Sequence, residues 1–420
     1  MIKEFSFGNF RSFKEIQSLN LTASKINEHS DTNIIPISEK QSLLKSKAIY
    51  GANASGKSNI IKALISFIEI INLSVKDETI LLKYIRLFLL SDENESAPSF
   101  FQLIFEVENI QYRYGFEANN HIITSEWLFG TPKEREVPYF IRENDKIIEI
   151  SKTHFAEGHK LVNLDVFRNN SLFLSTVGFL KGKLSKQLIN SINSITVLSG
   201  LEDKQLLIAG EELKNDEKKS KIIEFLKIAD TGINSIEVLK FTEELINEYV
   251  PERISNELKD FKDADLLIST HSKYNSEKVV LGEVALLFDD SQSAGTKKMF
   301  EISPFIIDAI SEDKTIIIDE FDARFHPLIS KKIIELFNSK ENKKGQLIYV
   351  THDTNLLSTD LLRRDQIDFV EKDKFGESHL YSLVQFKGIR NNSSIQKDYI
   401  RGKYGAIPFL GDFNQLFKTE

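Results

Sequence analysis

Residues 51–58 read Gly-Ala-Asn-Ala-Ser-Gly-Lys-Ser, and this stretch decides the fold. It follows a short apolar run, Ala48–Tyr50, and precedes a segment to about residue 73 whose apolar residues recur at helical spacing. A glycine-rich turn between a strand and a helix, closed by Lys and Ser, is the pattern of a phosphate-binding loop (P-loop). Its backbone N–H groups surround a phosphate, and the positive end of the helix adds to the attraction. The predicted phosphate-binding residues are Gly51, Asn53, Ala54, Ser55, Gly56, Lys57, Ser58 and Asn59.

Two side chains of this loop have separate predicted tasks. Lys57 is placed to reach the β- and γ-phosphates of a nucleoside triphosphate, and the Ser58 hydroxyl is placed to coordinate Mg²⁺. The sequence therefore predicts ATP and Mg²⁺ as ligands.

A second motif follows late in the chain, where the apolar run from Thr315 ends in the adjacent carboxylates Asp319 and Glu320. At the end of a buried strand, Asp319 would hold Mg²⁺ directly or through water. Glu320 would accept a proton from an attacking water as general base. Paired carboxylates alone are common in loops, and the P-loop is what favours this interpretation.

Two further segments are candidates on their residue types alone. A turn of small residues with Ser293, Gly295 and Thr296 opens a helical stretch and forms a second potential anion site, although an ordinary helix N-cap gives the same pattern. His352 ends another apolar strand, 346–350, where a purely structural histidine is the alternative.

Composition limits the functions open to this chain. Its 420 residues carry a net charge of -8, so nucleic acid would have to be met by a local basic patch such as Lys387, Arg390, Lys397, Arg401 and Lys403. The absence of cysteine excludes disulfides and thiolate metal sites and suits a reducing cytoplasm, where we expect the protein to reside. No apolar run is long and uncharged enough for a transmembrane helix.

The pattern of apolar residues predicts an α/β protein in three parts. Residues 1–150 contain the P-loop and then short alternating runs that predict an antiparallel sheet. Residues 151–265 are predicted to form an inserted, mainly helical lobe. Residues 266–420 alternate strand and helix as in a parallel sheet and carry the carboxylates and His352.

Taken together, the motifs resemble one family. The opening segment Asn9–Phe13, the P-loop, the Ser293–Thr296 turn, Asp319-Glu320, Thr351–Asp353 and the ending 399–408 are similar to those of bacterial ABC-type ATPases of the AAA class related to SMC, RecF and OLD proteins. The resemblance covers nearly the whole chain. It implies an ABC-type P-loop NTPase fold with a mixed sheet, an antiparallel β subdomain and an inserted helical lobe.

The resemblance also assigns roles. It implies that Ser293, Gly295 and Thr296 form a signature segment that contacts the γ-phosphate held by a second copy, so that two copies enclose ATP. It implies that His352 contacts the γ-phosphate and the attacking water. Asp322 and His326 stand where the family has a loop (the D-loop) crossing the dimer interface, although an ordinary helix-entry turn ending in Pro327 explains the same residues. Gln102 is the candidate for the glutamine that completes the Mg²⁺ site in this family. The signature reads Ser-Ala-Gly-Thr here, not the Leu-Ser-Gly-Gly of transporters.

Members of this group include ATPase subunits of phage-defence and abortive-infection systems. The resemblance therefore implies a sensor or scaffold that answers a phage trigger and controls a separately encoded nuclease or toxin. The alternative is a DNA-repair or recombination ATPase of the RecF or SMC type. A transport ATPase fits less well, because the chain has neither the transporter signature nor a membrane segment. A hexameric motor would place the paired carboxylates much closer to the P-loop. A single-chain nuclease would need a Toprim domain after the ATPase, yet only 68 residues follow His352 (420 minus 352).

Overall fold

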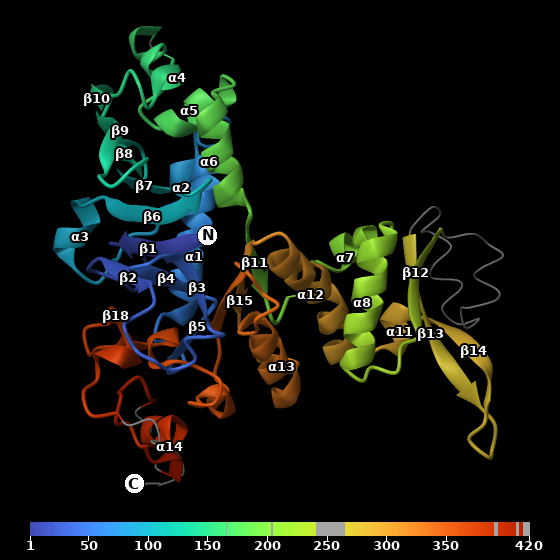
Figure 1. Ribbon diagram of the computed structural model, residues 1–420. Coiled ribbons are helices and arrows are strands. Elements are labelled where there is room, and N and C mark those ends of the chain that lie inside the picture. The colour runs from blue at the N-terminus through green and yellow to red at the C-terminus, as the bar shows by residue number, and fades with distance from the viewer. Residues whose placement is uncertain (165, 203–204, 241–264, 390–393, 409–410, 415–420) are drawn as a thin grey trace.

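The structure is a computed structural model that describes residues 1–164, 166–202, 205–240, 265–389, 394–408 and 411–414. Within these residues the two largest sheets share one hydrophobic core with the helix that follows the P-loop (Figure 1). None of the described helices has the length and apolar character needed to cross a membrane.

The first sheet is antiparallel and has seven strands in the order β10-β9-β8-β7-β6-β1-β2. The antiparallel sheet expected between residues 99 and 150 is confirmed. The sequence pattern does not predict β9, because Pro138 interrupts the alternation and the inward position of Arg142 holds a buried ion pair with Glu126 in place of an apolar residue. The strands are β1 (Ile2–Gly8), β2 (Gln17–Asn20), β6 (Ser99–Val107), β7 (Ile110–Ala118), β8 (Ile123–Thr131), β9 (Val137–Glu143) and β10 (Lys146–Ile150).

The second sheet, called the core sheet below, has the order β11-β15-β16-β5-β17-β18. Its strands are parallel except for the edge strand β18. Parallel strands have their carboxyl ends at the same edge, so the segments after β5, β15 and β16 come together there. The strands are β5 (Ser46–Gly51), β11 (Ile195–Ser199), β15 (Thr315–Asp319), β16 (Gln346–Val350), β17 (Ile367–Lys372) and β18 (Ser378–Ser382).

Helix α1 (Lys57–Leu73) lies between the two sheets and is buried on most of its surface, as its apolar residues predict. Phe67 stacks on Phe116 of the antiparallel sheet with ring centroids 5.6 Å apart. The same core includes Ile317 and Ile348 of the core sheet. The helix is therefore fixed from both sides, and its N-terminus, which carries the P-loop, is fixed with it.

Residues 151–265 divide between two parts of the molecule. β11 pairs in parallel with β15 and extends the core sheet. Its short length and its polar Thr196 and Ser199 hide this strand in the sequence pattern. Before β11, α5 (Phe173–Phe179) and α6 (Lys183–Asn193) pack on α1. After it, α7 (Leu206–Glu212) and α8 (Asp216–Ile228) pack on α12 (Ala294–Ser311). The three-part division remains a prediction, and residues 241–264 lie outside the described residues.

A side arm holds α7, α8 and α12 with the small sheet β12-β13-β14 (Figure 1). A hydrophobic cluster with Leu226 and Phe300 at its centre joins these elements. The arm is continuous with the core sheet because α12 leads directly into β15. Its elements are α7 (Leu206–Glu212), α8 (Asp216–Ile228), β12 (Ser235–Lys240), β13 (Asp265–Tyr274), β14 (Val280–Leu287) and α11 (Phe288–Ser291).

The remaining elements are short or lie at the periphery. They are β3 (Ile34–Ser38), β4 (Gln41–Leu44), α2 (Ile80–Tyr84), α3 (Asp92–Ser96), α4 (Ala156–His159), η1 (Val162–Leu164), α5 (Phe173–Phe179), α6 (Lys183–Asn193), α13 (Pro327–Phe337), η2 (Thr354–Leu356), η3 (Arg364–Gln366), η4 (Leu383–Gln385) and α14 (Ile395–Ile400).

Candidate nucleotide site

The P-loop joins β5 to α1, and its glycines stand where a side chain has no room. A Cβ atom on Gly51 would lie 2.4 Å from the carbonyl oxygen of Val370. Gly56 has a φ of +116°, and a Cβ there would lie 2.5 Å from Ser378 Oγ and 2.8 Å from Ser12 Oγ. The glycines therefore let the loop backbone pack closely against its neighbours. The backbone N–H groups at the start of α1 can then bind a phosphate.

Lys57 is folded back onto this loop. Its Nζ donates hydrogen bonds to the carbonyl oxygens of Gly51 (2.9 Å) and Ala52 (2.8 Å). Burial lowers the pKa of Lys57 to about 8, although the carboxylates of Asp319 and Glu320 oppose this shift. The ammonium is thus poorly solvated, and an incoming phosphate would give it a stronger partner than two carbonyl oxygens.

Asp319 is the last residue of β15 and Glu320 follows it, next to the P-loop at the same edge of the core sheet. Glu320 has a left-handed backbone (φ 52°), and a Cβ on Gly200 would lie 1.9 Å from its carbonyl oxygen. Gly200 N also donates to Asp319 O at 2.7 Å. A glycine after the neighbouring strand β11 is therefore required for this turn, a feature that the sequence pattern does not reveal.

The two carboxylates differ in their surroundings. Asp319 Oδ1 is buried and accepts no hydrogen bond from any described residue, so it has a lone pair available for a cation. Burial, followed by repulsion from Asp319 and Asp322, raises the pKa of Glu320. A raised pKa makes Glu320 a better proton acceptor, and such a carboxylate suits the task of a general base.

His352 follows β16, and its backbone N donates to Asp322 Oδ1 at 3.1 Å. This bond ties the loop after β15 to the loop after β16. Burial, and then the positive charge of Lys57, lower the pKa of His352. The imidazole is therefore neutral at pH 7 and carries one donor and one acceptor nitrogen.

These residues line one cavity of about 470 Å³ above the P-loop. The predicted residues Ser58, Glu320 and His352 are brought together there, and Asp319 lies directly beside Glu320. Ser58 and the free lone pair of Asp319 fit the oxygen ligands that Mg²⁺ prefers. The cavity is lined by Asn53, Ala54, Ser55, Gly56, Lys57, Ser58, Asn59, Glu320, Val350, His352 and Lys372.

Comparison with known proteins agrees with this geometry. The chain matches the family described as "AAA domain, putative AbiEii toxin, Type IV TA system" over residues 48–358, more than half of its length. The chain belongs to this AAA family. The ABC-type P-loop NTPase fold expected from the sequence is confirmed by the strand order and by the place of the P-loop. The matched range contains the P-loop, both carboxylates and His352.

Two solved structures are similar to this AAA protein. The SMC head domain from Thermotoga maritima is 12% identical, with a TM-score of 0.41, over 91% of this chain and 98% of that chain. An SMC head bound to the C-winged helix domain of ScpA is 13% identical, with a TM-score of 0.49, over 91% and 97%. Comparison with curated proteins finds no match.

Three residues beside the P-loop were not among the predicted ones. Ser378 Oγ contacts Ser55 O (2.5 Å) and Ser12 Oγ (2.9 Å), so two serines from distant segments support the αL turn at Gly56. Lys372 lines the 470 Å³ cavity above the P-loop, called the phosphate cavity below, from the end of β17. Ser12 stands inside the opening segment Asn9–Phe13, whereas no local signal marks Lys372 or Ser378.

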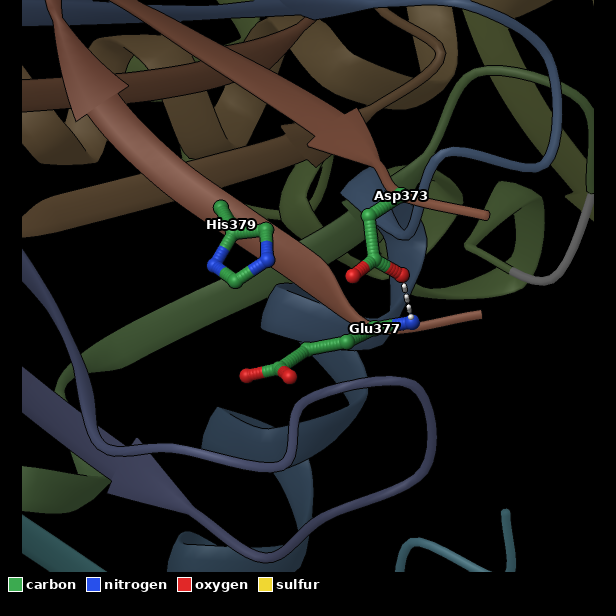
Figure 2. Close-up of side chains that lie close together, drawn as sticks. All are labelled: Asp373, Glu377 and His379. Atoms are coloured by element: carbon green, nitrogen blue, oxygen red, sulfur yellow. Dashed lines mark hydrogen bonds between the residues drawn. The ribbon is translucent and has the colours of Figure 1, made fainter. Parts of the chain in front are cut away.

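The hairpin between β17 and β18 sets Ser378 in this place. Asp373 Oδ1 accepts hydrogen bonds from the backbone N atoms of Phe375 and Glu377, both at 2.9 Å, and so closes the turn. Figure 2 shows Asp373 facing Glu377 and His379 across this hairpin. Asp373 stands just after β17, and its observed role is to hold the turn.

The segment Ser293–Thr296 lies away from the phosphate cavity of its own chain. Ser293 is the N-cap of α12, and its Oγ accepts from Thr296 N at 3.2 Å. A Cβ on Gly295 would lie 2.7 Å from the carbonyl oxygen of Arg324, so the helix start and the D-loop turn form one surface. One chain thus has two helix-start turns predicted to bind anions, and they do not share a cavity.

The structure does not bring Gln102 to the phosphate cavity. Gln102 lies on β6 of the antiparallel sheet and is not among the residues that line the phosphate cavity. Its Oε1 accepts from Trp127 Nε1 (3.1 Å) and Arg113 Nη1 (3.3 Å). The side chain is engaged within its own sheet, so it is not placed to complete a magnesium site.

Proposed function

We propose that this AAA protein is a Mg²⁺-dependent ATPase whose active site is completed by a second copy. The observation that carries the proposal is the separation of two anion-binding turns: the P-loop stands in a cavity with Glu320 and His352, and Ser293–Thr296 stands elsewhere on an exposed helix start. A two-fold dimer in which each Ser293–Thr296 segment faces the other copy's P-loop would bring the two together twice.

The roles of the residues follow from their surroundings. Lys57 exchanges its two carbonyl partners for phosphate oxygens, and the P-loop N–H groups hold the same phosphates. Glu320 takes the proton of the attacking water, and neutral His352 orients that water or the γ-phosphate. Bound Mg²⁺, held by Ser58 and Asp319, would neutralise charge on the phosphates.

We further propose that ATP binding and hydrolysis regulate a separately encoded nuclease or toxin in defence against phage. Two features support this role: the resemblance to defence-system ATPases, and the family's description as a putative AbiEii-type component of a toxin–antitoxin system. The trigger would be a phage protein or another sign of infection.

The second candidate is a DNA-repair ATPase, which the late basic residues favour. Arg390 lies outside the described residues, and Lys403 donates to Asp398 Oδ2 at 2.7 Å, which reduces the charge left for phosphate. We therefore place regulation of an effector first.

One experiment tests both levels of the proposal. The ATPase rate per chain is measured over a wide range of protein concentration, with and without duplex DNA and with and without the product of the adjacent gene. The proposal predicts a rate per chain that rises with concentration and responds to the adjacent product. A rate that is independent of concentration contradicts the shared site, and strong stimulation by DNA alone favours the repair function.

A further inference from the structure

A second cavity of about 840 Å³ lies on the other side of the P-loop, and we call it the tail groove. It shares Asn53, Ala54, Ser55, His352 and Lys372 with the phosphate cavity, so the two are continuous around the loop. Its far wall comes from the C-terminal segment. The lining residues used below are Glu371, Asp373, Tyr399, Ile400, Ile407 and Pro408.

The tail that forms this wall is firmly attached to the core sheet. Tyr399 and Tyr404 stack on Phe369 of β17, with ring centroids 5.2 and 5.7 Å apart. Tyr399 also meets the edge of Tyr50, the residue just before the P-loop. The wall is thus built on the same strands that position the phosphate site.

Backbone turns of the tail are fixed as well. Tyr381 OH donates to Tyr404 O (2.7 Å), and Tyr399 OH donates to Ala406 O (3.1 Å). Gly405 has a φ of +68°, and a Cβ there would lie 2.7 Å from Glu371 Oε2. These contacts hold the tail in one conformation, so it forms a fixed wall of the groove.

The groove wall nevertheless leaves apolar surface uncovered. Ile400 is 59% exposed, Ile407 is half-buried and Pro408 is exposed, all on the side that faces the P-loop cavity. Glu371 and Asp373 add two carboxylates to the same groove, and Lys372 lies between them. An apolar wall with acidic groups beside it fits a partner surface with an exposed apolar side chain and basic neighbours.

The chain presents such a surface itself, around the segment Ser293–Thr296. Gly295 packs against the carbonyl of Arg324. Ala294, next to Gly295, is exposed, and Leu328, four residues after Arg324, is 65% exposed. Lys297 and Arg324 are the basic residues of this surface. This face therefore combines exposed apolar residues with basic neighbours, which complement the apolar wall and the carboxylates of the tail groove.

We propose that the tail groove receives the face of a second copy that carries Ser293, Ala294 and Leu328. The C-terminal tail is then part of the ATP-enclosing interface. This inference rests on the proposed function. A helix about 10 Å across cannot bring Ser293 to phosphates in one cavity without covering the adjoining groove. Ile400 and Ile407 of one copy then meet Ala294 and Leu328 of the other.

Cross-linking tests the contact directly, because the chain has no cysteine of its own. Ile400→Cys in one copy is mixed with Leu328→Cys, or with Ala294→Cys, in the other, all in a Glu320→Gln background. A short bifunctional thiol reagent is added with and without ATP and Mg²⁺. We expect ATP to raise the yield of linked heterodimer by about tenfold in at least one pair, as for a contact made only in the dimer.

The control pair is Ile400→Cys with Ile228→Cys, since Ile228 is 79% exposed on α8 of the side arm. It should give no ATP-dependent product. If the Glu320→Gln chain dimerises with ATP in sedimentation but neither test pair links above this control, the tail groove is not the docking site. If that chain stays monomeric with ATP, the result contradicts the proposed function itself, because no ATP site is then shared between two copies.

A second measurement separates docking from nucleotide binding. Ile400→Asp should weaken ATP-dependent dimerisation by about tenfold, because a carboxylate would be buried against an apolar surface. ATP binding to the dilute monomer should stay unchanged, and Ile228→Asp should dimerise normally. Loss of monomer ATP binding with Ile400→Asp would overturn the proposal and make the groove part of the nucleotide site.

Discussion

The P-loop region and the Ser293–Thr296 region are both helix starts that bind anions in principle, yet the chain builds them in opposite ways. The P-loop is enclosed by Ser12, Ser378 and Val370, and carboxylates and a histidine stand beside it. The start of α12 is capped by its own Ser293 and is exposed above the D-loop turn. In the proposed dimer, the first turn holds the nucleotide and the second is what each copy would present to its partner.

The difference follows from where each turn lies. β5, β15 and β16 are adjacent and parallel, so burial of their apolar residues brings the P-loop, Glu320 and His352 to one edge without help from a partner. α12 belongs to the side arm, and no strand of the core sheet carries Ser293 toward that edge. Changes in the first region should therefore affect chemistry or nucleotide binding, and changes in the second should affect assembly.

The largest effect is expected from Glu320→Gln. Loss of the general base should lower kcat by roughly 100-fold or more, while ATP binding persists because the P-loop and Lys57 are untouched. Single-turnover hydrolysis and equilibrium ATP binding, measured side by side, check this. Glu224→Gln, an exposed carboxylate on α8, is the matched control and should hydrolyse ATP at the parental rate.

The raised pKa of Glu320 adds a dependence on pH. A base works only when deprotonated. As the solution is acidified, the hydrolysis rate should therefore begin to fall at a higher pH than it would if the base had the pKa of an ordinary carboxylate. Hydrolysis by Glu320→Gln at the parental rate would show that another group takes the proton.

A smaller effect concerns Lys57, whose pKa burial lowers to about 8. Phosphates favour the ammonium form, so above this pH ATP binding must take up a proton. The dissociation constant should then rise by up to about tenfold per pH unit. Calorimetry in buffers of different ionisation enthalpy measures the proton uptake. A dissociation constant for ATP that does not change between about pH 7 and 9 would contradict a Lys57 pKa lowered by burial.

The smallest effect is expected from Ser378→Ala, which removes the hydrogen bond to Ser55 O without touching a ligand. The loss of this hydrogen bond should destabilise the binding conformation of the P-loop by about 1 kcal/mol, which corresponds to about fivefold weaker ATP binding. Ser382→Ala in the same strand, whose Oγ contacts Ile367 O, is the control. An unchanged affinity for Ser378→Ala would mean that the P-loop keeps its turn without the hairpin.

Sequence patterns predicted the parts of the fold that depend on burial of local segments. The P-loop, α1, the strand before Asp319 and the antiparallel runs were predictable because each carries its own periodicity. β11 was not, since a five-residue edge strand with polar Thr196 and Ser199 has no distinctive pattern. β9 was hidden because a buried ion pair, Arg142 with Glu126, stands where an apolar residue was expected.

The candidate site shows the same limit. Lys57 opens the helix after β5, and Glu320 and His352 follow β15 and β16, so the parallel order of these three strands brings them together. Gly200 and Ser378 act through tertiary contacts with residues more than a hundred positions away, and nothing local marks them. Gln102 is not brought to this cavity, because it lies on β6 and its oxygen accepts from Trp127 and Arg113, and a glutamine near a strand start is not a specific signal.

Mixing two inactive variants tests the shared site most directly. Lys57→Ala removes the phosphate-binding ammonium, and Ser293→Arg blocks the exposed helix start at a cost of about 1 kcal/mol for the lost N-cap. Each variant alone should hydrolyse almost no ATP. In an equal mixture, half of the dimers are mixed and each has one intact site, so activity should recover to about a quarter of the parental value. A mixture as inactive as its components, with mixed dimers shown to form, would contradict a site shared between two copies.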